Sequence, residues 1–133
     1  MPYLIDSDWL IDHLAGIPPA IELLDGLAQE GLAISVITYM EVYQGVERSP
    51  NPEVARAKLT AFLDTVPVIA FESAIAERCA RLRETLRQQG KRVNSRALDL
   101  IIASTAIEHE LTLVTRNIED YEDISDLKLY QLK

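Results

Sequence analysis

The chain is poor in the residues that build disulfide frameworks, zinc sites and membrane spans. A single cysteine, Cys79, excludes an internal disulfide and fits a reducing compartment. Its two histidines, His13 and His109, have no His or Cys partner at ligand spacing, which argues against zinc. The uninterrupted apolar runs are far shorter than the ~20 residues of a membrane-spanning helix. With no basic-then-apolar leader pattern, we expect a cytoplasmic protein that has no membrane partner.

The charge is predominantly acidic but unevenly distributed. A net charge of −8 is unlike the basic footprint of most nucleic-acid binders. Seven of the thirteen basic residues nevertheless lie within one short stretch: Arg78, Arg81, Arg83, Arg87, Lys91, Arg92 and Arg96. Two interpretations stay open, because such a run is either a solvated helix face or a strip that faces phosphates or a partner.

Strand-like and helix-like segments alternate along the chain. The apolar patterns predict strands over 2–6, 32–37, 66–70 and 111–115, a possible edge strand over 127–131, and helices over 8–15, 19–30, 39–47, 52–64, 73–89 and 97–109. Strands that alternate with helices indicate a mostly parallel sheet, here of four to five strands, covered by helices on both faces. The length of 133 residues fits a single domain over 1–133.

Three acidic residues border apolar runs from distant parts of the chain. Asp6 ends the first predicted strand, Glu41 follows the second, and Asp99 opens a helix. An unpaired carboxylate is costly to bury, so each acid must be solvated, hydrogen-bonded or bound to a cation. Ligands of parallel sheets lie at the carboxyl ends of the strands, where these acids can meet. Oxygen ligands favour Mg²⁺ or Mn²⁺, so the sequence predicts a hard-metal site.

Helix capping is the rival explanation for each acid. Asp6 could cap the helix over 8–15, and Asp99 could cap its own helix. Thr38-x-x-Glu41 matches a capping box that has Thr38 as N-cap. His109 is expected at a helix C-terminus.

Four motifs resemble those of one family. The first, Tyr3–Ile11, contains Leu-Ile-Asp-Ser-Asp-x-Leu-Ile, and the second, Ser35–Val46, contains Ser-x-Ile-Thr-x-x-Glu-Val-x-x-Gly. The third, Asp99–Ala106, reads Asp-Leu-Ile-Ile-Ala-Ser-x-Ala. The fourth, Leu111–Tyr121, reads Leu-x-Leu-Val-Thr-x-Asn-x-x-Asp-Tyr. Their order and separations resemble PIN-domain ribonucleases, specifically VapC-type toxins of toxin–antitoxin pairs. The resemblance covers essentially the whole chain.

The resemblance implies a three-layer α/β/α fold and a metal-dependent endoribonuclease that uses Mg²⁺ or Mn²⁺. It also implies a protein antitoxin and homodimerisation. Asp6, Glu41 and Asp99 match the family's core acids, with Asp6 and Asp99 as direct metal ligands. Many members carry a fourth acid directly after Thr-Arg, where this chain has Asn117. Asp120, three residues later, is then the candidate for the fourth carboxylate.

The mechanism that the resemblance implies is in-line hydrolysis of an RNA phosphodiester. Glu41 or Asp120 would orient the attacking water. Hydrogen bonds around the ligands, or phosphate contacts, are expected from Ser7, Thr115 and Asn117. Arginines between 81 and 96, together with Arg116, are candidates for holding the RNA backbone.

Two other functions fit parts of the sequence. Asp6-Ser7-Asp8 looks like the Asp-x-Asp of haloacid-dehalogenase-type phosphatases, although none of the four lysines lies at an evident strand end. Alternatively, the acids only cap helices, and an apolar surface around Trp9, Ile11 and Leu14 binds a partner helix in a catalytically silent module. Mn²⁺ titration separates this module from a nuclease.

Overall fold

A five-stranded sheet forms the centre of the molecule. The computed structural model describes residues 2–132, so the outermost residues of the expected 1–133 domain lie outside the described residues. The strands are β1 (Tyr3–Ile5), β2 (Leu32–Ser35), β3 (Val68–Ile69), β4 (Thr112–Val114) and β5 (Lys128–Leu129). They are ordered β3-β2-β1-β4-β5, and each pairs with its neighbours in parallel. The predicted parallel sheet is therefore confirmed.

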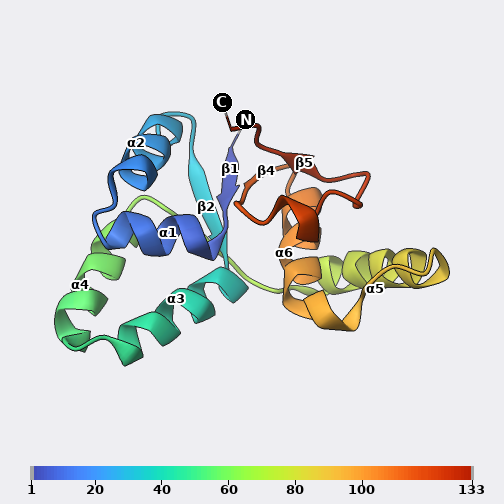
Figure 1. The fold of residues 1–133 in the computed structure, drawn as a ribbon, viewed down its shortest axis with the longest axis horizontal. Coiled ribbons are helices and arrows are strands. Elements are labelled where there is room, and N and C mark those ends of the chain that lie inside the picture. Colours follow the sequence, from blue (N-terminus) through green and yellow to red (C-terminus); the bar gives the residue numbers. More distant parts are fainter. Residues whose placement is uncertain (1, 133) are drawn as a thin grey trace.

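Within residues 2–132, six helices cover the two faces of this sheet (Figure 1). They are α1 (Ser7–Leu14), α2 (Pro18–Leu27), α3 (Val36–Arg48), α4 (Pro52–Leu63), α5 (Ser73–Gln88) and α6 (Ala97–Glu108). Short 3-10 turns over Asn94–Arg96 and Ile118–Asp120 precede α6 and follow β4. This is the expected three-layer α/β/α arrangement. Within residues 2–132, no helix is both long enough and apolar enough to cross a bilayer.

The strands divide their side chains between two apolar cores. Leu4 packs on the α5–α6 side while its neighbour Ile5 packs on the side of α1 to α4, because successive strand residues point to opposite faces. Leu113 and Val114 repeat this division on β4. Cys79 is 5% exposed in the α5–α6 core, as its helical position predicts. Burial on both faces explains why the strands are apolar runs rather than alternating ones.

The boundary between β2 and α3 differs from the prediction. β2 ends at Ser35 rather than at residue 37, and α3 begins at Val36. The N-cap is Ser35, whose Oγ accepts a hydrogen bond from the Thr38 backbone N–H at 3.1 Å. The predicted Thr38 cap and its capping box with Glu41 are therefore wrong. Glu41 lies inside α3, so its carboxylate does not cap this helix.

The remaining capping predictions have mixed outcomes. Asp6 is the N-cap of α1 and accepts a hydrogen bond from the Ser7 backbone N–H at 2.8 Å. His109 is the C-cap of α6, as expected. Asp99 does not cap α6, because the N-cap is Arg96 and Asp99 lies within the first turn. The expected strands over 66–70, 111–115 and 127–131 exist but are shorter at both ends.

Candidate active site

The order of the sheet reverses at β1. The connection from β1 leads to β2 on one side, whereas the chain later returns to β4 on the other side. Such a switch point opens a crevice at the carboxyl ends of the two diverging strands. Asp6 directly follows β1 and Thr115 directly follows β4, and the Thr115 hydroxyl donates to Asp6 Oδ2 at 2.7 Å. The topology thus joins two predicted site residues that are 109 positions apart.

The Asp6 carboxylate is buried and accepts hydrogen bonds from neighbouring polar groups. It is 4% exposed, and this burial raises its pKa above the ordinary value. Hydrogen bonds from Thr115 and from the Ser7 backbone work in the opposite direction, while repulsion from Asp8 adds to the increase. Asp6 can therefore both cap α1 and belong to an acidic site.

Glu41 and Asp99 come to the same crevice from two helices. Both are half-buried, and burial is the main reason why the pKa of each lies above its ordinary value. Repulsion from Asp6 and Asp99 raises the pKa of Glu41 further, whereas a hydrogen bond with Ser7 lowers it. Asp120 and Asp6 likewise raise the pKa of Asp99. Asp6, Glu41 and Asp99 are therefore close enough to raise one another's pKa.

Tyr121 also belongs to this group, although the sequence did not identify it. It is fully buried, and its hydroxyl donates to Asp99 Oδ1 at 3.2 Å. Burial, and then the charges of Asp6 and Asp99, raise the pKa of this phenol far above its usual value, which keeps it neutral. The one sequence signal was the place of this tyrosine at the last position of the fourth motif.

The donors in this crevice suit a hard divalent cation. Asp6, Glu41 and Asp99 make no ion pair with any lysine, arginine or histidine between residues 2 and 132. Carboxylates that raise one another's pKa favour a nearby cation, and their ligand atoms are all oxygen. In the same range, however, no group of three or more His, Cys, Asp or Glu side chains lies close enough together to hold a metal ion. An ion held by one or two of these carboxylates would keep water ligands, as Mg²⁺ commonly does.

Asp120 lies at the edge of the acidic group. Its carboxylate accepts a hydrogen bond from Arg92 at 3.0 Å, and its charge raises the pKa of Asp99. Arg96 fixes this segment, since its guanidinium donates to the Asp120 carbonyl at 2.9 Å and to both Asp123 oxygens at 2.7 Å. Arg96 is only 3% exposed, so its expected role as a contact for RNA is wrong. It is a structural anchor.

The loop after β4 contacts the start of α1. Asn117 donates to Asp8 at 3.3 Å, and its backbone N–H donates to the Thr115 hydroxyl at 3.1 Å. Arg116 stacks on the Trp9 ring at 3.8 Å and forms an ion pair with Asp12 at 2.6 Å. Asn117 therefore stands beside the acids. Arg116 is held against α1, although part of its side chain stays exposed.

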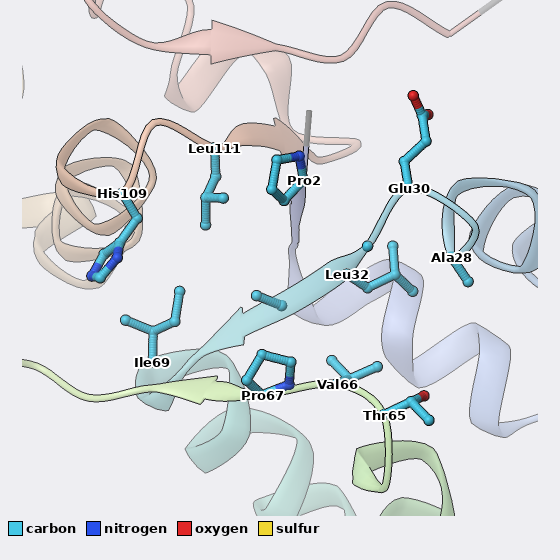
Figure 2. Close-up of a pocket in the computed structure, with 12 residues that line it drawn as sticks. Pro2, Ala28, Glu30, Leu32, Thr65, Val66, Pro67, Ile69, His109 and Leu111 are labelled. Carbon is cyan, nitrogen blue, oxygen red and sulfur yellow. The ribbon is translucent and has the colours of Figure 1, made fainter.

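A separate apolar cavity lies at the other end of the sheet. It measures about 550 Å³ and is lined by residues at the amino ends of the strands, among them Pro2, Leu32, Pro67 and Leu111 (Figure 2). Glu30 and His109 stand at opposite ends of the labelled group. The cavity contains none of the clustered acids, so it is separate from the acidic crevice and its chemistry.

Comparison with known proteins agrees with this geometry. The family model described as PIN domain matches residues 3–126. Ribonuclease VapC2 of Rickettsia felis is 37% identical over 131 residues, which cover 97% of this chain and 96% of that protein. The tRNA(fMet)-specific endonuclease VapC of Shigella flexneri is 27% identical and is covered to 96%.

Solved structures give the same result. VapBC2 from Rickettsia felis, bound to a DNA fragment from its promoter, contains a chain that matches with a TM-score of 0.86 and 30% identity, over 100% of both chains. VapBC from Salmonella typhimurium, also bound to DNA, matches with a TM-score of 0.85 and 26% identity, over 98% of this chain and 97% of that one. The chain therefore belongs to the PIN-domain family and, within it, to the VapC ribonucleases.

Proposed function

We propose that the chain is a metal-dependent endoribonuclease that acts as the toxin of a toxin–antitoxin pair. The observation that carries this proposal is that Asp6, at the switch point of the sheet, raises the pKa of both Glu41 and Asp99, while no lysine, arginine or histidine between residues 2 and 132 forms an ion pair with these three acids. The names of the relatives support RNA as the substrate. Mg²⁺ and Mn²⁺ are the cations that this oxygen donor set favours.

Each acid has a role in this proposal. Asp6 and Asp99 would hold the cation directly, and Glu41 would complete the site directly or through water. When bound, the cation would polarise the scissile phosphate and activate water for attack. Asp120 would orient that water or accept its proton, and Arg92 restrains the Asp120 carboxylate. Thr115 holds Asp6 and Asn117 holds Asp8 through hydrogen bonds, and the Ser7 hydroxyl lowers the pKa of Glu41.

The RNA backbone would be contacted by exposed basic side chains of the chain. Arg81 and Lys91 are exposed on α5 and on the turn after it. Arg92 and Arg116 each pair with an acid yet remain partly exposed, so they can also approach a phosphate. These cations would offset an otherwise acidic chain, because phosphate contacts supply most non-specific nucleic-acid affinity.

The proposed antitoxin would bind an apolar groove between α1, α3 and α4. The groove has a volume of about 310 Å³, and Ile11 and Val54 at its edge are 42% and 49% exposed. An amphipathic helix fits such a groove because its apolar side chains replace water there. The solved VapBC complexes among the structural neighbours support a protein partner. We further propose a homodimer, which sedimentation analysis of the purified chain tests.

The direct test is RNA cleavage by an Asp99→Ala variant. The variant should lose cleavage in Mg²⁺ or Mn²⁺ while its circular dichroism stays native. Asp126→Ala, which removes an exposed acid outside the site, is the matched control and should cleave like the parent. Full activity of Asp99→Ala would refute the proposed site.

Two alternatives predict other results. A haloacid-dehalogenase-type phosphatase would cleave an aryl phosphate ester. The structure disfavours it, because no lysine between residues 2 and 132 pairs with the clustered acids. A catalytically silent module would show no saturable heat on titration with Mn²⁺.

A further inference from the structure

A hydroxyl group lies near each of the three acids. Thr115 donates a hydrogen bond to Asp6 and Tyr121 donates one to Asp99, while the Ser7 hydroxyl lies near enough to Glu41 to lower the pKa of that carboxyl. A lysine or arginine partner would cancel the charge of a carboxylate and compete with a bound cation. A neutral hydroxyl instead restrains the carboxylate and leaves its charge available. Ser7 and Thr115 belong to the predicted site, whereas Tyr121 does not.

We propose that Tyr121 is a positioning residue, whose hydroxyl fixes the Asp99 carboxylate in the orientation that holds the divalent cation. The bond from the phenol to Asp99 Oδ1 measures 3.2 Å and joins residues 22 positions apart. It occupies one oxygen, and no hydrogen bond between residues 2 and 132 engages the other, Oδ2, which can serve as a ligand. Groups that restrain metal ligands in this way contribute to metal affinity although they do not touch the metal.

Packing alone does not explain the hydroxyl group. The Tyr121 ring is fully buried in the α5–α6 core among Leu100, Ala103 and Ile124, a role that phenylalanine would fill equally well. The hydroxyl must find a partner in this interior, because an unbonded buried hydroxyl destabilises the fold. Its partner is an acid of the site, and the phenol also lies near enough to Asp6 to lower the pKa of that carboxyl.

Anchors on both sides in sequence fix the position of Tyr121. Before it, the Asp120 carbonyl accepts a hydrogen bond from Arg96 at 2.9 Å. After it, Asp123 accepts two hydrogen bonds from the same guanidinium at 2.7 Å. The buried Arg96 thus holds the backbone that carries the phenol, so Asp99 is restrained by a group that is itself restrained.

This inference rests on the proposed function, and its test uses metal binding rather than cleavage alone. Mn²⁺ affinity is measured by calorimetric titration of the metal-free parent chain, the Tyr121→Phe variant and the Asp99→Asn variant. Tyr3→Phe is the matched control, because the Tyr3 hydroxyl also donates to a carboxylate, Glu30 at 3.0 Å, at the opposite end of β1. Thermal unfolding of each variant is recorded beside its titration.

We expect Tyr121→Phe to bind Mn²⁺ about tenfold more weakly than the parent. Tyr3→Phe should keep the affinity of the parent, and Asp99→Asn should show no saturable binding. Both tyrosine variants should retain a cooperative transition, with a Tm within about 6 °C of the parent. Excess Mn²⁺ should restore RNA cleavage by Tyr121→Phe but not by Asp99→Asn.

The outcomes separate the two proposals. Parent-like Mn²⁺ binding by Asp99→Asn would overturn the proposed site itself. Loss of binding in Asp99→Asn together with parent-like affinity in Tyr121→Phe would overturn only the positioning role. A Tyr121→Phe variant that has lost its cooperative transition would also overturn that role, because the hydroxyl would then serve the core.

Discussion

Thr115 donates a hydrogen bond of 2.7 Å to Asp6, and both residues are almost completely buried. The bond ties the end of β4 to the end of β1, the two strands between which the sheet order reverses. The same hydroxyl accepts a hydrogen bond from the Asn117 backbone at 3.1 Å. One side chain therefore fixes both an acid of the site and the loop that follows it.

Replacing this hydroxyl should weaken the fold as well as the site. Thr115→Val keeps the shape of the side chain but leaves Asp6 Oδ2 without its donor, which should cost about 1–3 kcal/mol in the free energy of unfolding. Thr115→Ser retains the hydroxyl and is the matched control. Urea unfolding at pH 7 measures the difference, and equal stability of the two variants would contradict the role given to this bond.

The acidic group should make the metal-free protein less stable as the pH rises. Burial raises the pKa of Asp6, Glu41 and Asp99 in the folded protein, so the folded state holds these protons more tightly than the unfolded chain does. The stability they contribute is fully present below the ordinary carboxyl pKa of about 4, and it is lost as the pH rises through the raised values.

Other acids act in the opposite direction. The Arg96 guanidinium lowers the pKa of Asp123, and Arg78 lowers that of Glu108, so the stability from these two pairs is lost on acidification. With a chelator present, unfolding free energy should therefore pass through a maximum on the acidic side and decline toward pH 7. Asp6→Asn should flatten that decline. A parent protein that gains stability steadily from pH 5 to pH 7 would contradict this account.

The buried Arg96 should make Asp123 important for stability. Arg96 has 2% of its side chain exposed, and Asp123 has 24%. Asp123→Ala leaves a buried guanidinium without its carboxylate, which should cost about 2–4 kcal/mol. Glu84→Gln removes the partner of Arg87 on the exposed surface of α5 and should leave thermal unfolding unchanged. Equal Tm values for the two variants would show that Arg96 is not an anchor.

Gly45 offers a test of the proposed antitoxin groove. It lines that groove on α3, and a Cβ atom added there meets nothing within 4 Å in the chain itself. Gly45→Leu should therefore leave the free chain folded, since a helix interior favours leucine over glycine by roughly 0.5–1 kcal/mol. The larger side chain fills part of the groove, so it should weaken binding of the antitoxin.

The control for this test is Gly26→Leu. Gly26 is also helical and has open space around a Cβ atom, but it lies on α2 and does not line the groove. Its variant should bind the antitoxin like the parent. Binding of a purified antitoxin is measured by calorimetry, and equal affinity of the two leucine variants would place the partner elsewhere.

The topology and the acidic group could be predicted because they depend on patterns along the chain. Apolar runs that alternate with amphipathic helices specify a parallel sheet, and its strand ends bring Asp6 and Thr115 to one edge. The start of α3 could not be predicted in this way. Val36 and Ile37 continue the apolar run of β2, and their β-branched side chains suit a strand, although Ser35 caps a helix there.

The missed residues are those whose role depends on a distant partner. Arg96 lies in a basic run and so looks solvent-exposed, yet Asp123, 27 positions away, pairs with it in the interior. In the sequence, Tyr121 cannot be distinguished from an ordinary core aromatic residue. Only the folded structure shows its hydroxyl beside Asp99. Local pattern gives no information about such contacts, because the tertiary structure creates them.

Anomalous diffraction from crystals grown with Mn²⁺ tests the central claim most directly. The account predicts a manganese peak in the crevice after β1, with carboxylate oxygens of Asp6 and Asp99 at about 2 Å from the ion. Manganese bound only elsewhere on the molecule, with these two side chains free of any ion at saturating concentration, would contradict it.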